Sequence, residues 1–297
     1  MLKRRTRRAF QMFVMCAQLG YGQSQAETAG SSWVDKGVQK LEQARELGSQ
    51  YAIITFSQYR LWGSDGVNSP NTNALDDYRE VLQAAQDLGM TPIGTSTTWV
   101  FPDFADAPLV PSTLPPNHAG LEEARIACIP DLGGLEYQRL SNVRNEMWAT
   151  LAQEFSDVES WFVGYEPGLE FYDCSGEQIQ GEDLFTYIVD TLEGVSAAIK
   201  STNPSAKSIA HFLGRSGMPV HVRDELVQPQ DIINRIRTEI SARGKSQAGI
   251  IDDYAFTLEP NLLAERFPEE HSSLPMGAAR SSHLDCVKTY CRSTAPH

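Results

Sequence analysis

The sequence predicts an α/β fold of the (β/α)8 barrel class, in which a parallel sheet closes inside a ring of helices. Three observations predict it. Helical periodicity alternates with short apolar strands, the connections from strand to helix are much longer than those from helix to strand, and no glycine-rich phosphate-binding turn follows a strand. A chain of 297 residues is long enough for one large domain of this kind.

The first two units share one order of helix, glycine and strand. A helix that includes Leu41 is followed by Gly48 and by a strand over residues 51–56. A second helix, with Asn73 in position to cap its start, stops at Gly89 and leads to a strand over residues 90–98. The segments ARELGSQYAIITF and AQDLGMTPIGTST therefore read as two copies of one unit.

Three more units follow along the chain. Helices over residues 140–155, 184–199 and 232–240 lead to strands over residues 161–165, 207–213 and 249–256. About five to six βα units are thus visible. Long connections all follow strands, at residues 57–73 and 99–133, and (β/α)8 enzymes build their sites from such loops. An open doubly wound sheet shares part of this asymmetry, but it would usually carry a phosphate-binding turn.

The two ends of the predicted barrel are less regular. No strand is evident before the helix that begins near Val34, and residues 258–297 are rich in Pro, Ser and charge without periodicity. We therefore expect a barrel domain over residues 33–260 and an irregular C-terminal segment over residues 261–297. Roughly three of eight strands are unassigned. Both an incomplete barrel and a divergent barrel with weak outer strands are consistent with this pattern.

Residues 1–26 have the three parts of a secretory signal peptide. A basic cluster precedes an apolar run over residues 9–20, and Ser24-Gln25-Ala26 has the small-x-small pattern of a cleavage site. The stretch T-R-R-A-F at residues 6–10 resembles the twin-arginine variant of such signals. The pattern predicts export to the periplasm or the extracellular space. A disordered basic tail and an organellar presequence are the alternatives.

Charge and composition limit the partners of this chain. The formal net charge is -13, which disfavours nucleic acid because phosphate binding relies on Lys and Arg. Hydrophobic residues make up 41% of the chain and charged residues 21%, which are ordinary values for a globular protein, so no membrane span is expected. A neutral sugar remains compatible with this net charge, because its binding does not rely on Lys and Arg.

Cysteine usage fits an oxidising compartment. Four cysteines lie beyond the expected signal peptide, and an even number suits pairing. Cys128 and Cys174 lie in the loops that flank one helix-strand unit, so a disulfide between them is expected on one barrel face. Cys286 and Cys291 could pair locally. The chain has no C-x-x-C pair and no His cluster at ligand spacing, so neither a metal site nor a cofactor is expected.

The segment W-F-V-G-Y-E-P at residues 161–167 is an apolar strand that ends in a carboxylate and a proline. Here the chain resembles glycoside hydrolases of the large TIM-barrel clan, and in particular secreted glycosidase-related barrels. In that clan a tripeptide such as N-E-P presents the general acid/base at a strand tip. The resemblance spans about residues 34–260 and implies that Glu166 is the acid. Tyr165 stands where many of these enzymes have Asn, so the side chain that usually makes the hydrogen bond to the sugar 2-hydroxyl is replaced.

Chemistry gives a separate reason to consider Glu166. Glycosidic cleavage needs a carboxylic acid with a raised pKa, and a strand tip inside a cleft removes water from such a group. Glu170 is a rival, because a proline turn could present either residue. A solvated loop acid or a helix cap is the structural alternative for Glu166.

A second carboxylate is required for either stereochemical outcome. Asp252 and Asp253, on the last visible strand, are candidates because ionised groups in a buried strand are costly unless they are used or paired. Glu259 follows the same strand. A structural salt bridge or a strand-end turn explains the two aspartates at least as well.

Aromatic residues cluster after the strands and could contact the C–H faces of sugars. The candidate substrate-binding residues are Trp62, Trp99, Tyr165, Tyr172, His211 and Tyr254. For His211 a structural role fits better. No G-x-S-x-G or H-E-x-x-H motif is present, so serine esterase and zincin chemistry have no support. The sequence predicts a secreted glycoside hydrolase-like protein that acts on an oligo- or polysaccharide, and a non-catalytic carbohydrate-binding barrel is the alternative.

Overall fold

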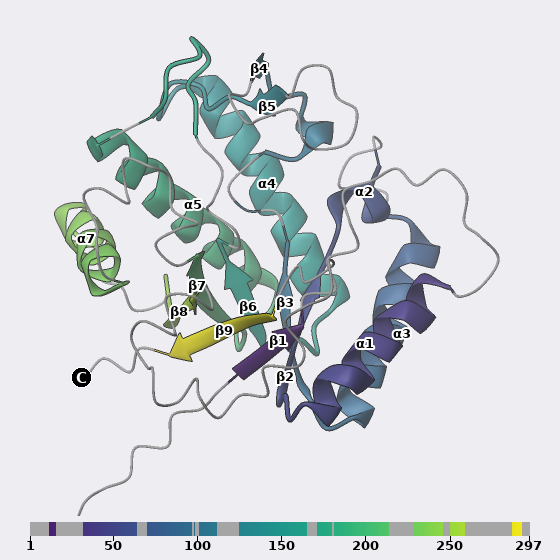
Figure 1. Cartoon of the computed structure of the whole chain (residues 1–297). Coiled ribbons are helices and arrows are strands. Elements are labelled where there is room, and N and C mark those ends of the chain that lie inside the picture. The colour runs from purple at the N-terminus through teal and green to yellow at the C-terminus, as the bar shows by residue number, and fades with distance from the viewer. Residues whose placement is uncertain are drawn as a thin grey trace, which may run out of the picture.

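The computed structural model describes residues 12–15, 32–63, 70–96, 98, 101–111, 125–164, 171–179, 181–213, 229–245, 250–258 and 287–292. It is an α/β fold around one seven-stranded sheet with the order β1-β9-β8-β7-β6-β3-β2 (Figure 1). The strands are β1 (Met12–Met15), β2 (Tyr51–Thr55), β3 (Thr91–Thr95), β6 (Ser160–Val163), β7 (Lys207–Leu213), β8 (Asp253–Leu258) and β9 (Val287–Arg292). A second sheet pairs β4 (Leu109–Pro111) with β5 (Arg125–Ala127).

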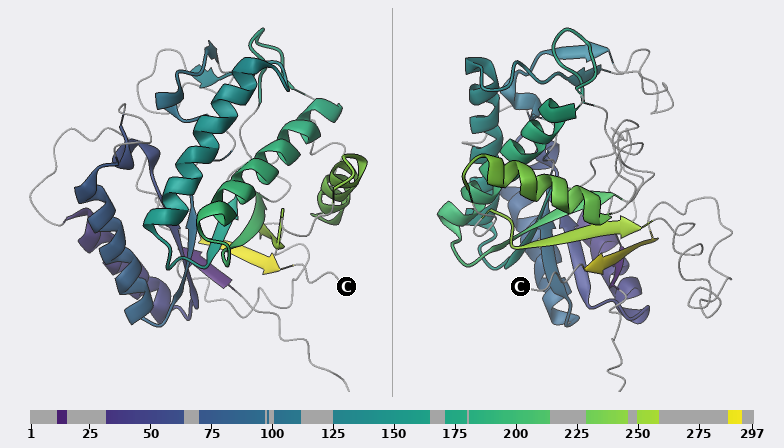
Figure 2. Two further views of the ribbon diagram at one scale, coloured as in Figure 1. Left: turned by 180° about the vertical axis from the view of Figure 1, so that it is seen from behind. Right: turned by 90° about the vertical axis from the view of Figure 1, so that its left-hand side faces the viewer.

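The helices cover one face of the larger sheet. They are α1 (Trp33–Glu46), α2 (Gln58–Leu61), α3 (Thr72–Asp87), α4 (Leu135–Glu154), α5 (Gly181–Thr202) and α7 (Pro229–Ala242), with a short 3-10 turn, η1 (Asp103–Ala105). Helices α1 and α3 lie side by side at one end, and α7 lies at the other (Figure 1). Seen from behind, α4 and α5 lie side by side across the strands (Figure 2).

All five predicted helix-strand units are present. Strands β8, β7, β6, β3 and β2 pair with one another in parallel, and each follows a helix, which confirms the α/β class with a parallel sheet. One helix start was predicted wrongly. Helix α3 begins at Thr72, and its cap is Asn71, whose Oδ1 accepts from the backbone N–H of Ala74 at 3.2 Å. Asn73 therefore lies inside the helix.

The two ends of the sheet differ from the sequence prediction. Strand β9 falls in the segment that was expected to be irregular, and β1 falls in the segment that was expected to be a signal peptide. Both strands are antiparallel to their neighbours, so neither belongs to a helix-strand unit. The sequence V-K-T-Y-C-R of β9 does not alternate strictly between apolar and polar residues, so it gives only a weak strand signal.

The parallel strands are staggered in a regular way. Strand β3 starts level with β2, and β6 starts two residues further along than β3. Strand β7 starts level with β6, and β8 again starts two residues further along. The mean advance is therefore about one residue per strand. The edge strands β1 and β2 approach each other within 8 Å between Cα atoms, although no ladder hydrogen bonds join them in the described part of the chain.

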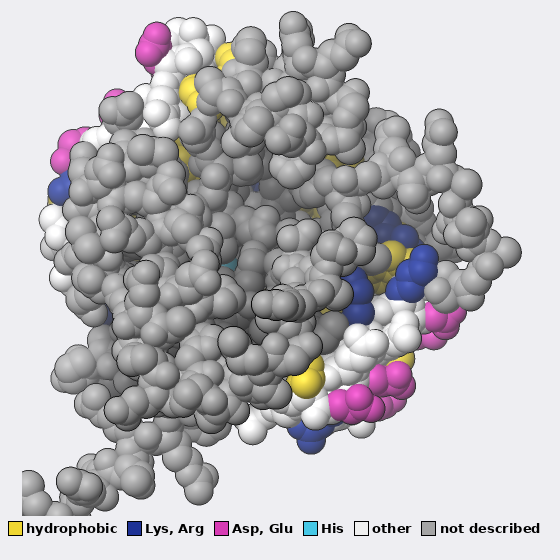
Figure 3. All heavy atoms as spheres, viewed as in Figure 1, with side chains coloured by type: hydrophobic (Ala, Val, Ile, Leu, Met, Phe, Trp, Pro, Cys, Tyr) yellow, Lys and Arg dark blue, Asp and Glu magenta, His cyan; other side chains and the backbone are white. Residues whose placement is uncertain are grey.

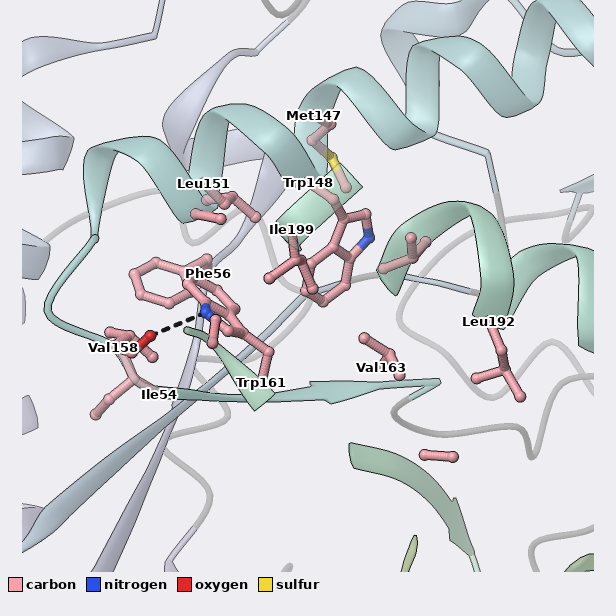
Figure 4. Packing of buried hydrophobic residues seen from close by; sticks show 14 of the residues in the cluster. Ile54, Phe56, Met147, Trp148, Leu151, Val158, Trp161, Val163, Leu192 and Ile199 are labelled. Atoms are coloured by element: carbon pink, nitrogen blue, oxygen red, sulfur yellow. Dashed lines mark hydrogen bonds between the residues drawn. The ribbon is translucent and has the colours of Figure 1, made fainter. Parts of the chain in front are cut away.

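The two faces of the sheet bury different side chains. On the helix side, Ile54, Phe56, Trp161 and Val163 pack against α4 and α5 (Figure 4). Trp161 is fully buried and donates its indole N–H to the Val158 carbonyl at 3.1 Å. Because side chains alternate along a strand, the opposite face carries a second buried set. Its members are Ile53, Ile93, Thr95, Phe162 and His211.

Candidate functional site

The carboxyl end of β6 is tied to the chain that continues from β3. Gly164, directly after β6, donates its backbone N–H to the hydroxyl of Thr98 at 3.1 Å. Thr98 is fully buried, and its hydroxyl donates to the Ser96 carbonyl at 3.2 Å. Gly164 has a φ of 85°, a conformation that strongly favours glycine. The direction in which the chain leaves β6 is therefore set by a glycine turn and a buried hydroxyl.

A buried arginine supports the same turn from the helix side. Arg144 of α4 is fully buried, and its Nη1 donates to the Thr98 carbonyl at 3.5 Å and to the Tyr187 hydroxyl at 3.4 Å. Its guanidinium lies 5.3 Å from the ring of Phe101 and 5.9 Å from that of Tyr187, within cation–π range. Burial raises the pKa of Tyr187, so this hydroxyl is protonated at neutral pH. These contacts hold Thr98 against two helices.

His211 lies on the neighbouring strand β7, close to the same end of β6. It is fully buried, and its imidazole stacks on the Phe162 ring with centroids 4.8 Å apart and planes 14° apart. Thr95 donates its hydroxyl to the Phe162 carbonyl at 3.1 Å. The candidate His211 therefore lies beside β6 in a stacked and enclosed position.

The predicted disulfide between Cys128 and Cys174 is present, with Cα atoms 5.0 Å apart. It joins the segment after β5 to the segment that follows residue 170. Next to it, the backbone N–H of Ile129 donates to the Tyr172 carbonyl at 2.8 Å, and Ile129 pairs with Asp173 in a parallel bridge. The two long loops of this face are therefore joined to each other.

Several predicted site residues lie outside the described part of the chain. These are Glu166, Glu170, Tyr165, Trp99, Glu259 and Cys286. Tyr254 and Cys291 lie within β8 and β9, but their side chains are also outside the description. The structure therefore describes the strands that precede or contain these residues in the sequence, and the roles proposed for the residues stay predictions.

The structure does not bring Asp252 and Asp253 to the carboxyl end of β6. Asp253 is the first residue of β8, so both aspartates lie where the strand begins. The Asp252 carboxylate pairs with Lys200 Nζ at 2.8 Å and accepts from the Ser208 backbone N–H at 2.8 Å. This is the structural salt bridge that was the alternative for Asp252. Asp252 is therefore corrected to a structural role, and Asp253 lies at the start of β8, away from the carboxyl ends of the strands.

Two aromatic candidates also need correction. Trp62 is only 3% exposed and belongs to the main core, where its ring lies 6.0 Å from that of Phe104. Tyr172 is 7% exposed and packs with Val110 and Cys128 in a small separate cluster. The loops that carry these rings fold back on the molecule, and the one after β2 forms α2. Neither ring offers an open face to a sugar in this conformation.

Sequence reasoning missed Arg144 and Thr98. A signal for Arg144 was present, because it follows Leu140 by four residues and precedes Leu151 by seven on the apolar stripe of α4. A charged residue on such a stripe needs specific partners when it is buried. No comparable signal marks Thr98, since its role depends on the distance between β3 and β6.

The described surface carries charges of both signs. Figure 3 shows Lys and Arg side chains close to Asp and Glu side chains over α1 and α3. Within the described ranges, no helix has the length and apolar character needed to cross a membrane. The same ranges hold no cluster of three His, Cys, Asp or Glu residues suited to a metal ion.

Comparison with known proteins gives structural resemblance alone. No family model and no curated protein matches the chain. A beta-glucosidase from Thermotoga maritima in complex with castanospermine matches 61% of this chain and 38% of its own, at 17% identity and a TM-score of 0.42. The beta-glucosidase from the same organism in complex with cyclophellitol matches 77% and 56%, at 15% identity and a TM-score of 0.44. The AHE enzyme from Alicyclobacillus herbarius matches 61% and 38%, at 13% identity and a TM-score of 0.41. The chain thus spans about two fifths to just over half of these enzymes.

Proposed function

We propose that this chain is a glycoside hydrolase that cleaves an oligo- or polysaccharide by carboxylate acid/base catalysis, with Glu166 as the general acid. One observation carries the proposal. Strand β6 has parallel neighbours on both sides and ends in the fixed turn at Gly164, and Glu166 follows this glycine by only two residues. Sites of parallel α/β folds form at the carboxyl ends of the strands.

The regular stagger supports a barrel as the frame of this site. The five parallel strands advance by a mean of about one residue per strand, which is the advance of an eight-stranded barrel with a shear of eight, and the edge strands β1 and β2 approach one another. A barrel brings the carboxyl ends of non-adjacent strands around one opening. Strand β6 is the middle one of the five parallel strands. A carboxylate that follows β6 would then lie at that opening.

The proposed acid role needs a raised pKa at Glu166, which burial of the carboxylate among apolar groups would supply. Phe162 and Phe171, before and after this segment in the sequence, are both buried. The buried Arg144 guanidinium, which donates to the Thr98 carbonyl beside the Gly164 turn, would act in the opposite direction, since a nearby cation favours the ionised carboxylate.

We propose Glu259 as the second carboxylate on the basis of its position in the sequence. It directly follows Leu258, the last residue of β8, whereas Asp252 and Asp253 lie at the start of that strand. Strands β6 and β8 are separated by β7 alone, so their axes are about 10 Å apart at the spacing of neighbouring strands. Carboxylates at the two strand tips could therefore reach the separation of about 5–9.5 Å that glycosidases use.

Hydrolysis by the wild-type protein tests the proposal. We expect new reducing ends on at least one member of a panel of neutral oligo- and polysaccharides, and release of nitrophenol from at least one aryl glycoside. Heat-unfolded protein is the control. Binding to a glycan array without any hydrolysis would instead establish the non-catalytic barrel, which keeps the strand-end frame and lacks a working acid pair.

We also propose that the protein is exported, and the disulfide supports this because such bonds persist in oxidising compartments. N-terminal sequencing of secreted material should then start near Glu27. Cleavage there would remove β1 and leave β9 as the edge of the sheet. An intact Met1 on cytoplasmic protein would contradict export.

A further inference from the structure

We propose that Thr55 and Gln58, at the carboxyl end of β2, bind hydroxyl groups of the substrate sugar. This inference rests on the proposed function and names two further binding residues for the same site. It is carried by a contrast at this strand end, where the backbone is held by hydrogen bonds and two buried side-chain oxygens are not.

The backbone that ends β2 is held from two sides. On the β3 side, the Phe56 N–H donates to the Thr95 carbonyl at 2.8 Å. On the helix side, the Tyr78 hydroxyl accepts from the Ser57 N–H at 2.8 Å and donates to the Thr55 carbonyl at 3.2 Å. Burial raises the pKa of Tyr78 to about 12, so this hydroxyl keeps its proton at neutral pH. The strand end is therefore a fixed support for the side chains that it carries.

Two side-chain oxygens at the same strand end have no hydrogen-bond partner in the described part of the chain. They are Thr55 Oγ1 and Gln58 Oε1, and both are buried. Gln58 is the first residue of α2, and its side chain belongs to a residue that is only 3% exposed. A buried polar atom without a partner destabilises the folded state, and nearly all such atoms in proteins are paired. These two oxygens are therefore suited to a partner that arrives from solution.

Thr55 lies on the face of the sheet opposite the helices. It follows Ile53 of that face by two residues, and it pairs in register with Thr95 of β3. Thr95 already uses its own hydroxyl, which donates to the Phe162 carbonyl at 3.1 Å. Thr55 is therefore at the carboxyl end of the parallel strands, on the face that a barrel encloses, which is where the proposed site forms.

The chemistry of the two oxygens favours neutral hydroxyl groups as the ligand. An amide oxygen only accepts hydrogen bonds, so Gln58 Oε1 binds a donor and does not bind an anion. The Thr55 hydroxyl can donate or accept, and a sugar hydroxyl can do the same in return. Arg60, two residues after Gln58, pairs with Asp77, so these two charges balance each other. A neutral sugar therefore satisfies both oxygens without bringing a charge.

The first test separates a binding role from a structural one by thermal unfolding. Gln58→Met and Thr55→Val remove unpaired oxygens, so the unfolding midpoint should stay the same or rise. Thr95→Val is the matched control, because it removes a paired hydroxyl and leaves the Phe162 carbonyl without that donor. Its midpoint should fall by about 2–4 °C. A fall of this size in Gln58→Met and Thr55→Val would show that the protein or a buried water already uses both oxygens, which would overturn the inference.

The second test is the kinetics on whichever of cellohexaose, xylohexaose and mannohexaose the wild-type protein hydrolyses. Gln58→Met and Thr55→Val should each raise KM about 3- to 10-fold with kcat changed less than twofold. The reason is that a hydrogen bond to a hydroxyl away from the reacting bond stabilises the ground state and the transition state alike. Gln83→Met, at an exposed side chain of α3, should leave both constants unchanged. An unchanged KM in both site variants would overturn the inference.

Calorimetric binding of the same three hexasaccharides distinguishes this inference from the proposed function. If the wild-type protein binds one of them without hydrolysis, the Kd takes the place of KM. A Kd about 3- to 10-fold weaker in Gln58→Met and Thr55→Val would then retain both residues as sugar ligands and reject catalysis. The absence of binding by wild type, or an equal Kd in wild type and both variants, would overturn the inference.

Discussion

Glu166→Gln is expected to lower kcat on natural oligosaccharides by about 10² to 10⁴, the usual contribution of a general acid. Glutamine has nearly the same shape but has no proton to give to the leaving oxygen. Aryl glycosides with good leaving groups should be nearly spared if the second carboxylate is a nucleophile. The measurement is kcat and KM for both substrate classes, together with the unfolding midpoint of each protein.

Two variants control this experiment. Asp252→Asn changes a carboxylate that pairs with Lys200 where β8 begins, so it should leave kcat within about twofold. Glu170→Gln tests the rival acid of the same segment. Full activity of Glu166→Gln together with loss in Glu170→Gln would move the acid role to Glu170.

Trp161→Ala is expected to reduce the free energy of unfolding by about 3–5 kcal/mol, the usual cost of removing a large buried aromatic side chain. Its ring is fully buried, lies 6.0 Å from that of Trp148 in an edge-to-face arrangement, and lies 5.6 Å from that of Phe56. Urea unfolding measures the change. Leu135→Ala, at a side chain that is 87% exposed, should cost less than about 0.5 kcal/mol.

A change at Gly94 gives a second test of how the Trp161 ring packs. A Cβ at residue 94 would lie 2.5 Å from two ring atoms of Trp161, so Gly94→Ala should cost about 1–3 kcal/mol through overpacking. In the Trp161→Ala background the space is empty, and the same change should cost almost nothing. Additive costs in the double variant would show that the ring does not lie on Gly94.

The helix-strand units could be predicted from the sequence because each combines the periodicity of a helix with a short apolar strand. The spacing of Leu75, Tyr78, Leu82 and Ala85 predicts a helix, and these residues are buried on one face of α3. The short apolar strands that follow each helix pair in parallel, as alternation requires. The antiparallel strands β1 and β9 belong to no such repeat, and their pairing joins residues from opposite ends of the chain.

The disulfide was predictable because the long loop that carries Cys128 follows β3 and the loop that carries Cys174 follows β6, and the carboxyl ends of parallel strands share an edge. Burial of the aromatic rings was not. Trp62 follows a strand into a loop, and nothing in its sequence neighbourhood shows that α2 turns it into the core. Asp252 shows the same limit, since only the pairing of β7 with β8 reveals that it lies where the strand begins.

The distance between the carboxyl groups of Glu166 and Glu259 in a crystal structure of the wild-type protein tests the central claim most directly. A glycosidase frame predicts about 5–5.5 Å for a retaining enzyme or about 6.5–9.5 Å for an inverting one, with both groups facing one opening. A Glu166 carboxylate directed into bulk solvent, with no second carboxylate within about 10 Å, would contradict acid/base catalysis at this strand tip.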